Sequence, residues 1–172
     1  MTCPEGNRDD GGWKDGWRNG QGVMTYANGD RDGMRYEGEW KDGNYNGQGV
    51  FTTPDGSRFE GEWKNGKRNG QGVMTLPEGH RYEGEWKDGE RNGQGVVTWP
   101  DGYRFKGEFK DAFFNGEGVF TWITGRQYKG VFKDSIRGDN KFQYTDPEGQ
   151  TYEITIDDDS TPPTLSSRLL TE

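Results

Sequence analysis

Few residues in this sequence could act as catalytic or metal-binding groups. His80 is the only histidine and Cys3 the only cysteine, so the sequence supports neither a Ser–His or Cys–His nucleophile pair nor a zinc site of usual composition. A single cysteine forms no intrachain disulfide, which favours a reducing compartment such as the cytoplasm. We therefore predict that the chain is not an enzyme and has no catalytic residue, cofactor or metal site.

Carboxylates are numerous, but they recur at a fixed spacing. Glu37 and Glu39 are followed 23 residues later by Glu60 and Glu62, and after another 23 by Glu83 and Glu85. A periodic set of this kind is typical of a solvated strand face rather than of an acid–base pair. The segment 30–33 resembles the start of a calcium loop, but it lacks the further ligands and the terminal glutamate.

The same 23-residue spacing governs the whole sequence. Gly-Glu-Trp occurs at 38–40, 61–63 and 84–86, and it weakens to Gly-Glu-Phe at 107–109 and Gly-Val-Phe at 130–132. A fixed period in this range is the mark of a repeat architecture. Such arrays present long surfaces rather than catalytic clefts.

Each repeat contains the pattern of a β-hairpin. Residues 58–64 alternate, with Phe59, Gly61 and Trp63 on one face, and residues 71–76 form a second strand. Asn65-Gly66 and Asn69-Gly70 have turn chemistry, and residues 77–79 lead to the next hairpin. The fold class predicted is all-β: an elongated, twisted single-sheet solenoid of antiparallel hairpins.

The predicted organisation has three parts. Residues 1–11 form an N-terminal extension, residues 12–156 an array of about six units with the first and last incomplete, and residues 157–172 an acidic, proline-containing tail. The tail is interpreted either as disordered or as a short C-terminal helix. Four extra residues near Asp30–Gly33 lengthen one connection between hairpins.

The repeat departs from its pattern toward the C-terminus. Asp111-Ala112 and Asp134-Ser135 replace Asp-Gly, so we predict that these turns change shape. Phe113 and Phe114 follow the first of them, where earlier copies have Lys67-Arg68 or Glu90-Arg91. The degraded last unit has two interpretations: a capping unit, or a homodimer or partner surface with Phe113 and Phe114 as apolar anchors.

The quoted motifs carry a family resemblance. Residues 82–89, Tyr-Glu-Gly-Glu-Trp-Lys-Asp-Gly, with Arg-Asn-Gly-Gln-Gly-Val at 91–96 and Pro-Asp-Gly at 100–102, resemble the MORN repeat, and the resemblance covers roughly residues 12–150. It implies a solenoid of β-hairpins with a concave, aromatic-lined groove. It also implies a non-enzymatic scaffold, cytoskeletal or ciliary, or a module attached to a lipid kinase or a lysine methyltransferase.

Paired rings are the candidate binding residues, because large rigid aromatics often anchor interfaces. The alternative interpretation is that they pack the core between hairpins. The predicted groove residues are Tyr36, Trp40, Phe59, Trp63, Tyr82, Trp86, Phe105, Phe109, Tyr128 and Phe132.

The charge pattern limits the classes of partner. Net charge is −8, and no basic patch is evident, so nucleic acid is not expected. Anionic lipid is disfavoured for the same reason. A protein segment is therefore the predicted partner, and peripheral phospholipid binding is the second interpretation.

Overall fold

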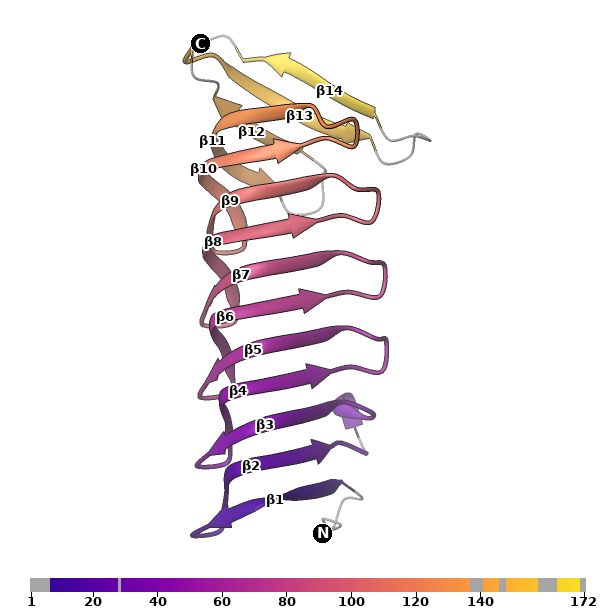
Figure 1. Cartoon of the computed structure of the whole chain (residues 1–172), viewed down its shortest axis with the longest axis vertical. Coiled ribbons are helices and arrows are strands. Elements are labelled where there is room, and N and C mark those ends of the chain that lie inside the picture. The colour runs from indigo at the N-terminus through magenta and orange to yellow at the C-terminus, as the bar shows by residue number, and fades with distance from the viewer. Residues whose placement is uncertain (1–6, 28, 137–140, 146–147, 158–163, 171–172) are drawn as a thin grey trace. The chain divides into compact units, whose positions relative to one another are not determined.

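The computed structural model describes residues 7–27, 29–136, 141–145, 148–157 and 164–170 (Figure 1). The chain divides into two units, residues 1–90 and 91–172. In each unit every strand pairs antiparallel with the next strand of that unit. The predicted all-β array of antiparallel hairpins is confirmed.

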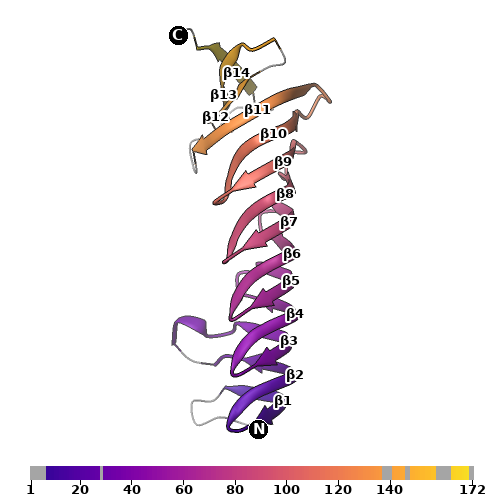
Figure 2. The same cartoon turned by 90° about the vertical axis from the view of Figure 1, so that its left-hand side faces the viewer.

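The first unit contains seven strands among its described residues and one short 3-10 helix, η1 (Gly29–Arg31), in the predicted insert. Figure 2 shows η1 projecting away from the strands. The strands are β1 (Arg8–Lys14), β2 (Trp17–Thr25), β3 (Arg35–Lys41), β4 (Asn44–Thr52), β5 (Arg58–Lys64), β6 (Lys67–Thr75) and β7 (Arg81–Lys87).

The second unit is also an antiparallel meander. Its described strands are β8 (Glu90–Thr98, whose first residue closes the preceding unit), β9 (Arg104–Lys110), β10 (Phe113–Thr121), β11 (Gln127–Ile136), β12 (Lys141–Thr145), β13 (Thr151–Asp157) and β14 (Thr164–Leu169).

The hairpin turn forms because its residues tolerate a left-handed backbone. Asn65 and Gly66 have φ of 50° and 79°, the pair of positive angles that a two-residue type I′ turn requires. The second Asn-Gly is not part of this turn, contrary to the sequence prediction. It lies inside β6, where Gly70 has φ of 79° and the register shifts between Gly61 and Trp63. This is a β-bulge.

In the hairpins β3–β4 and β5–β6, the glutamate directly before the tryptophan of the first strand stabilises the bulge. Glu62 Oε1 accepts the Gln71 backbone N–H at 2.9 Å, and Glu39 Oε1 accepts that of Gln48 at 3.0 Å. The other glutamate column pairs with arginine on the same strand, as Glu60 does with Arg58 at 2.7 Å. Only this second column matches the solvated face that the sequence predicted, and its exposed pairs contribute little to stability.

The altered turn at Asp111-Ala112 keeps the shape of the others, so that prediction is wrong. Asp111 and Ala112 have φ of 50° and 72°. The Ala112 N–H donates to the Arg91 carbonyl at 3.0 Å, the bond that Gly66 makes to Tyr45 at 2.9 Å. Docking of the turn on the preceding hairpin therefore holds an alanine in a conformation that suits glycine.

Replacing Ala112 with glycine should raise the free energy of unfolding by about 1 kcal/mol, because it removes the penalty for a side chain at positive φ. Urea denaturation followed by far-UV circular dichroism measures the change. Ala27→Gly is the matched control, since Ala27 is exposed and is not among the residues of positive φ. If the Ala112→Gly variant were no more stable than the parent, the positive φ of Ala112 would carry no energetic penalty.

Three other predictions about the ends need correction. β1 begins at Arg8, inside the segment assigned to the N-terminal extension. β11 runs through Asp134 and Ser135 to Ile136, so no turn forms there. Residues 164–169 of the predicted tail form β14, which pairs with β13, rather than a helix or disordered chain. Residues 137–140 of the degraded last unit and the aspartates 158–159 of the tail lie outside the described residues.

Candidate functional site: the concave ring face

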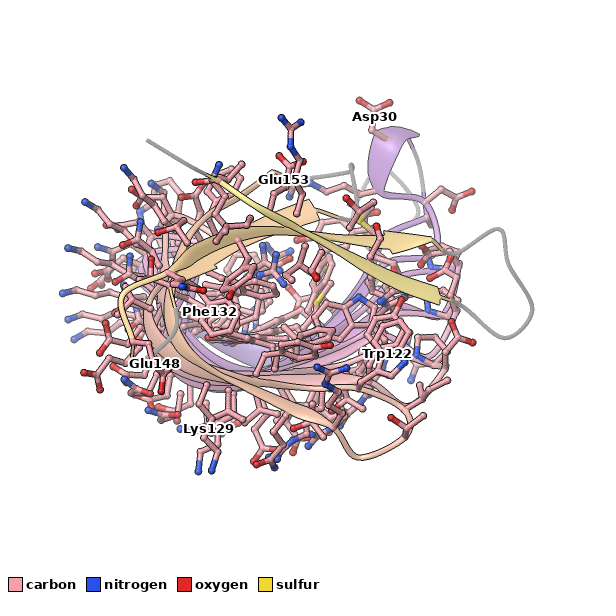
Figure 3. All side chains as sticks on the ribbon, turned by 90° about the horizontal axis from the view of Figure 1, so that it is seen from above. Asp30, Trp122, Lys129, Phe132, Glu148 and Glu153 are labelled. Atoms are coloured by element: carbon pink, nitrogen blue, oxygen red, sulfur yellow. The ribbon has the colours of Figure 1, made fainter. Side chains whose placement is uncertain are left out.

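The strands of each unit bend along their length, which gives the sheet a concave face (Figure 2). In the second unit, Figure 3 shows Phe132 on the inner side of the curved strands and Lys129 pointing outward. Period-two alternation explains this sorting, because neighbouring side chains of a strand point to opposite faces. Phe59, Gly61 and Trp63 of β5 are buried in the same way, between exposed Arg58, Glu60 and Lys64.

Glycine pairs make room for the rings. Gly61 lies opposite Gly72, and a Cβ on Gly72 would lie 2.5 Å from Phe59 Cζ. A Cβ on Gly49 would lie 2.3 Å from the Tyr36 hydroxyl. In these two hairpins the first ring therefore lies over a glycine of the partner strand, where no side chain is in the way.

The second ring of each pair joins one hairpin to the hairpin before it. Trp63 Nε1 donates to the Gly49 carbonyl at 3.2 Å, and the ring meets Tyr36 edge-on at 5.6 Å between centroids. Trp86 repeats this bond to Gly72 at 3.2 Å. Edge-to-face ring contacts add to the stabilisation from buried area.

The predicted groove rings are therefore mostly core. Nine of the ten are buried, with exposed fractions from 0% for Tyr36 to 8% for Trp63, and Tyr128 is half-buried. Of these rings, Trp40, Phe59 and Trp63 line the hollows described below.

A second set of concave residues was missed by the sequence analysis. It stands five positions after the second ring of each repeat, and we call it the cross-strand column; its members are Arg18, Tyr45, Arg68, Arg91 and Phe114. Within the units it lies opposite that ring in the ladder, as Arg68 does opposite Trp63 and Phe114 opposite Phe109. The constant spacing from the second ring could have revealed this column in the sequence, but its residue types vary too much for the column to be recognised as a repeat position.

Members of the cross-strand column stack on the rings. Tyr45 lies parallel to Tyr36 at 3.8 Å, and Phe114 lies on Phe105 at 4.0 Å. The Arg68 guanidinium lies 4.4 Å from the Trp86 ring centroid and that of Arg18 lies 5.1 Å from Trp40. Both are cation–π geometries.

The candidate self-association anchors occupy different positions. Phe114 is buried at 8% exposure, in contact with Phe105 and Phe109, so its ring is not exposed to a second copy. Phe113 is half-buried. The predicted dimer surface thus loses one of its two apolar anchors.

The first unit contains an open groove on this face. Two adjoining hollows, of about 400 and 520 Å³, share Arg31, Tyr45 and Gly66. We call them together the Tyr45 groove, defined by Tyr26, Arg31, Tyr45, Phe51, Arg68 and Met74. Volumes of this size suit a few side chains of a bound segment.

The insert between β2 and β3 contributes to the groove wall. Tyr26, just after β2, shares a 2.7 Å hydroxyl–hydroxyl hydrogen bond with Tyr45, and Arg31 of η1 lies 5.4 Å from the Tyr26 ring centroid. Burial and the hydrogen bond to Tyr26 raise the pKa of Tyr45, and burial raises that of Tyr36. Both phenols therefore remain neutral hydrogen-bonding groups at physiological pH.

The described residues that were candidates for chemistry are not gathered into a site. His80 lies in the turn between β6 and β7, where its carbonyl accepts the Leu76 N–H at 2.9 Å. Among the described residues, no group of three histidine, cysteine, aspartate or glutamate side chains could hold a metal ion. In that same part of the chain, no helix has the length and apolarity needed to cross a bilayer.

Comparison with known proteins identifies the repeat. The family model for the MORN repeat matches residues 10–31, 36–58, 59–81, 82–102 and 105–125. The comparison with curated proteins gave no match.

Solved structures give weaker similarities. The chain is similar to the SAS-4 (dCPAP) TCP domain of Drosophila melanogaster, solved in complex with a proline-rich motif of Ana2, at 10% identity and a TM-score of 0.45, covering 98% of this chain and 80% of that one. It is also similar to the G-box domain of the microcephaly protein CPAP, at 15% identity and a TM-score of 0.35, covering 99% and 97%.

Proposed function

Because this chain belongs to the MORN-repeat family, we propose that it is a non-enzymatic scaffold that binds a segment of a partner protein along its concave face. The Tyr45 groove is the observation that carries the proposal. It combines half-buried rings, which anchor interfaces well, with fixed polar groups that can set the register of a bound chain. Cytoplasmic localisation with cytoskeletal or ciliary association remains a prediction within this proposal.

Phospholipid binding is the second candidate function, and a targeting role within a larger lipid kinase or lysine methyltransferase is the third. Sedimentation with anionic and neutral vesicles tests the second, since peripheral binding to anionic lipid is sensitive to salt. The length of the gene that encodes the chain tests the third.

The proposal predicts that removing the apolar floor of the Tyr45 groove abolishes partner recovery. In the double variant Phe51→Ser/Met74→Ser, both changed residues line the groove and are half-buried, so the fold should tolerate the change better than loss of a core ring. Immobilised protein incubated with native cell extract should lose its specific partner by at least about tenfold, as expected for loss of interface anchors.

Val50→Ser/Val73→Ser is the matched control. Val50 and Val73 precede Phe51 and Met74 on the same strands, are also half-buried, and point to the opposite face. Partner recovery should survive in this variant. Unchanged recovery by a folded Phe51→Ser/Met74→Ser protein would refute binding at the groove.

A further inference from the structure

We propose that the Tyr45 groove recognises an acidic segment of the partner protein, with a carboxylate of that segment bound at Arg68. This inference rests on the proposed function and specifies the chemistry of the partner. It starts from the positive charge of the groove, which the repeat pattern in the sequence does not reveal.

The two hollows of the groove are lined by basic residues but by no acidic residue among those described. The cationic side chains on this face are those of Arg18, Arg31 and Arg68; Arg58 and Lys67 also line the hollows, but they belong to the exposed face of the sheet with Glu60 and Lys64. The chain as a whole carries a net charge of −8, so this face is opposite in sign to the average surface. Complementary charge steers association and selects partners.

Two of these three cations, Arg31 and Arg68, have no ion pair among the described residues. Arg18 is paired with buried Asp9 at 2.6 Å. The nearby Asp55 is occupied within its own turn, where it accepts hydrogen bonds from Thr53 and Ser57. The cations of the groove are therefore only partly neutralised by the protein itself.

Arg68 is the better positioned of the two. Its guanidinium lies between Trp86 at 4.4 Å and Phe59 at 5.7 Å, and Nη2 donates to the Gly89 carbonyl at 2.8 Å. These contacts fix the planar group before a ligand arrives, which suits guanidinium to carboxylate recognition. Burial lowers the pKa of Arg68, a sign that its charge is partly desolvated without a counter-ion.

The surroundings of Arg68 favour a protein segment over a membrane. The guanidinium is half-buried in a concave face, where a flat bilayer surface would not reach it. Phe51, Tyr45 and Met74 line the same groove and offer apolar contact beside the charge. A segment with an acidic residue next to an apolar residue would pair with Arg68 and contact the apolar lining beside it.

Selection from a library of random dodecapeptides displayed on phage tests the chemistry of the bound segment. We expect enriched peptides to combine aspartate or glutamate with an apolar residue. The most enriched peptide, synthesised with a fluorophore, should bind at least about tenfold more tightly than its Asn/Gln counterpart, as expected when one member of a buried charge pair is removed. Because this comparison uses the unaltered protein, folding of a variant does not affect it.

Protein variants locate the site. Arg31→Gln/Arg68→Gln should weaken binding of the acidic peptide at least about tenfold, whereas Lys41→Gln/Lys64→Gln, which removes the same charge from exposed residues of the opposite face, should bind as the parent does. Arg31→Gln alone changes only exposed η1 and should give a smaller loss in the same direction. Circular dichroism melting checks that each variant is folded.

The outcomes separate this inference from the proposed function. Enrichment of neutral peptides, or equal binding of the Asn/Gln counterpart, would overturn the acidic segment while leaving a protein-binding groove. A library that yields no binding peptide would overturn both. Binding of phosphatidylserine vesicles or of a twenty-nucleotide oligothymidine that is lost in Arg31→Gln/Arg68→Gln would reassign the groove to lipid or to nucleic acid.

Discussion

Replacing Trp63 with alanine should lower the free energy of unfolding by about 4 kcal/mol, the cost of deleting a buried tryptophan. Trp63 is 8% exposed, donates to the Gly49 carbonyl and meets the rings of Tyr36, Tyr45 and Phe59. The substitution leaves a cavity between two hairpins and an unsatisfied carbonyl. Urea denaturation with far-UV circular dichroism measures the loss.

Trp17→Ala is the control for Trp63→Ala. Trp17 belongs to the same unit but is 62% exposed, so its removal should cost no more than about 1 kcal/mol. Similar losses for the two variants would show that the ring pairs are not the core. The large expected loss also means that a missing partner in Trp63→Ala would not by itself locate a binding site.

Gly72→Ala should cost about 3 kcal/mol, at the upper end of the usual range for overpacking. Its Cβ would lie 2.5 Å from Phe59 Cζ and 3.3 Å from the Glu60 carbonyl oxygen. Because Gly72 is not among the residues of positive φ, the penalty arises from the clash with the ring. The melting temperature should fall by roughly 6–12 °C for a chain of this size.

Gly56→Ala separates crowding from backbone strain. Gly56 has φ of 92°, and its only Cβ neighbour within 4 Å is Pro77 Cγ at 3.9 Å, so alanine there should cost only about 1 kcal/mol of strain. If Gly72→Ala were as stable as Gly56→Ala, the contact between the Phe59 ring and residue 72 would not be the reason that position 72 requires glycine. A second variant, Gly49→Ala, should repeat the Gly72→Ala result at Tyr36.

Much of the fold was predictable because the same strand and turn residues recur in several repeats. Alternation around Phe59 and Trp63 predicted the strand, and Asn65-Gly66 predicted the turn. The second Asn-Gly was misread, because the same dipeptide suits a turn and a bulge. Only pairing across the hairpin decides between them, and there Glu62 caps the Gln71 N–H.

Ala112 shows a different limit of sequence reasoning. Local preference predicted a changed turn, yet the bond from its N–H to the Arg91 carbonyl holds the usual geometry. A tertiary contact therefore outweighs a backbone penalty of about 1 kcal/mol. β14 was missed for a similar reason, since its pairing with β13 depends on long-range contact rather than on its own pattern.

The candidate site was the least predictable part. Periodicity correctly selected residues of the concave face, but it could not separate buried rings from groove residues. Nor could it show that Arg31 of the insert and Arg68 of β6 line one groove, because 36 positions and several strands separate them in sequence. The absence of a basic patch in the sequence therefore did not predict the charge of this face.

Site-specific photo-crosslinking tests the central claim most directly. A benzophenone amino acid would replace Met74, which lines the Tyr45 groove, or its neighbour Val73, which points to the opposite face. Incubated with native cell extract and irradiated, the protein with the probe at 74 should form a covalent adduct with one partner protein, and the protein with the probe at 73 should not. Adducts from position 73 with none from position 74 would contradict binding on the concave face.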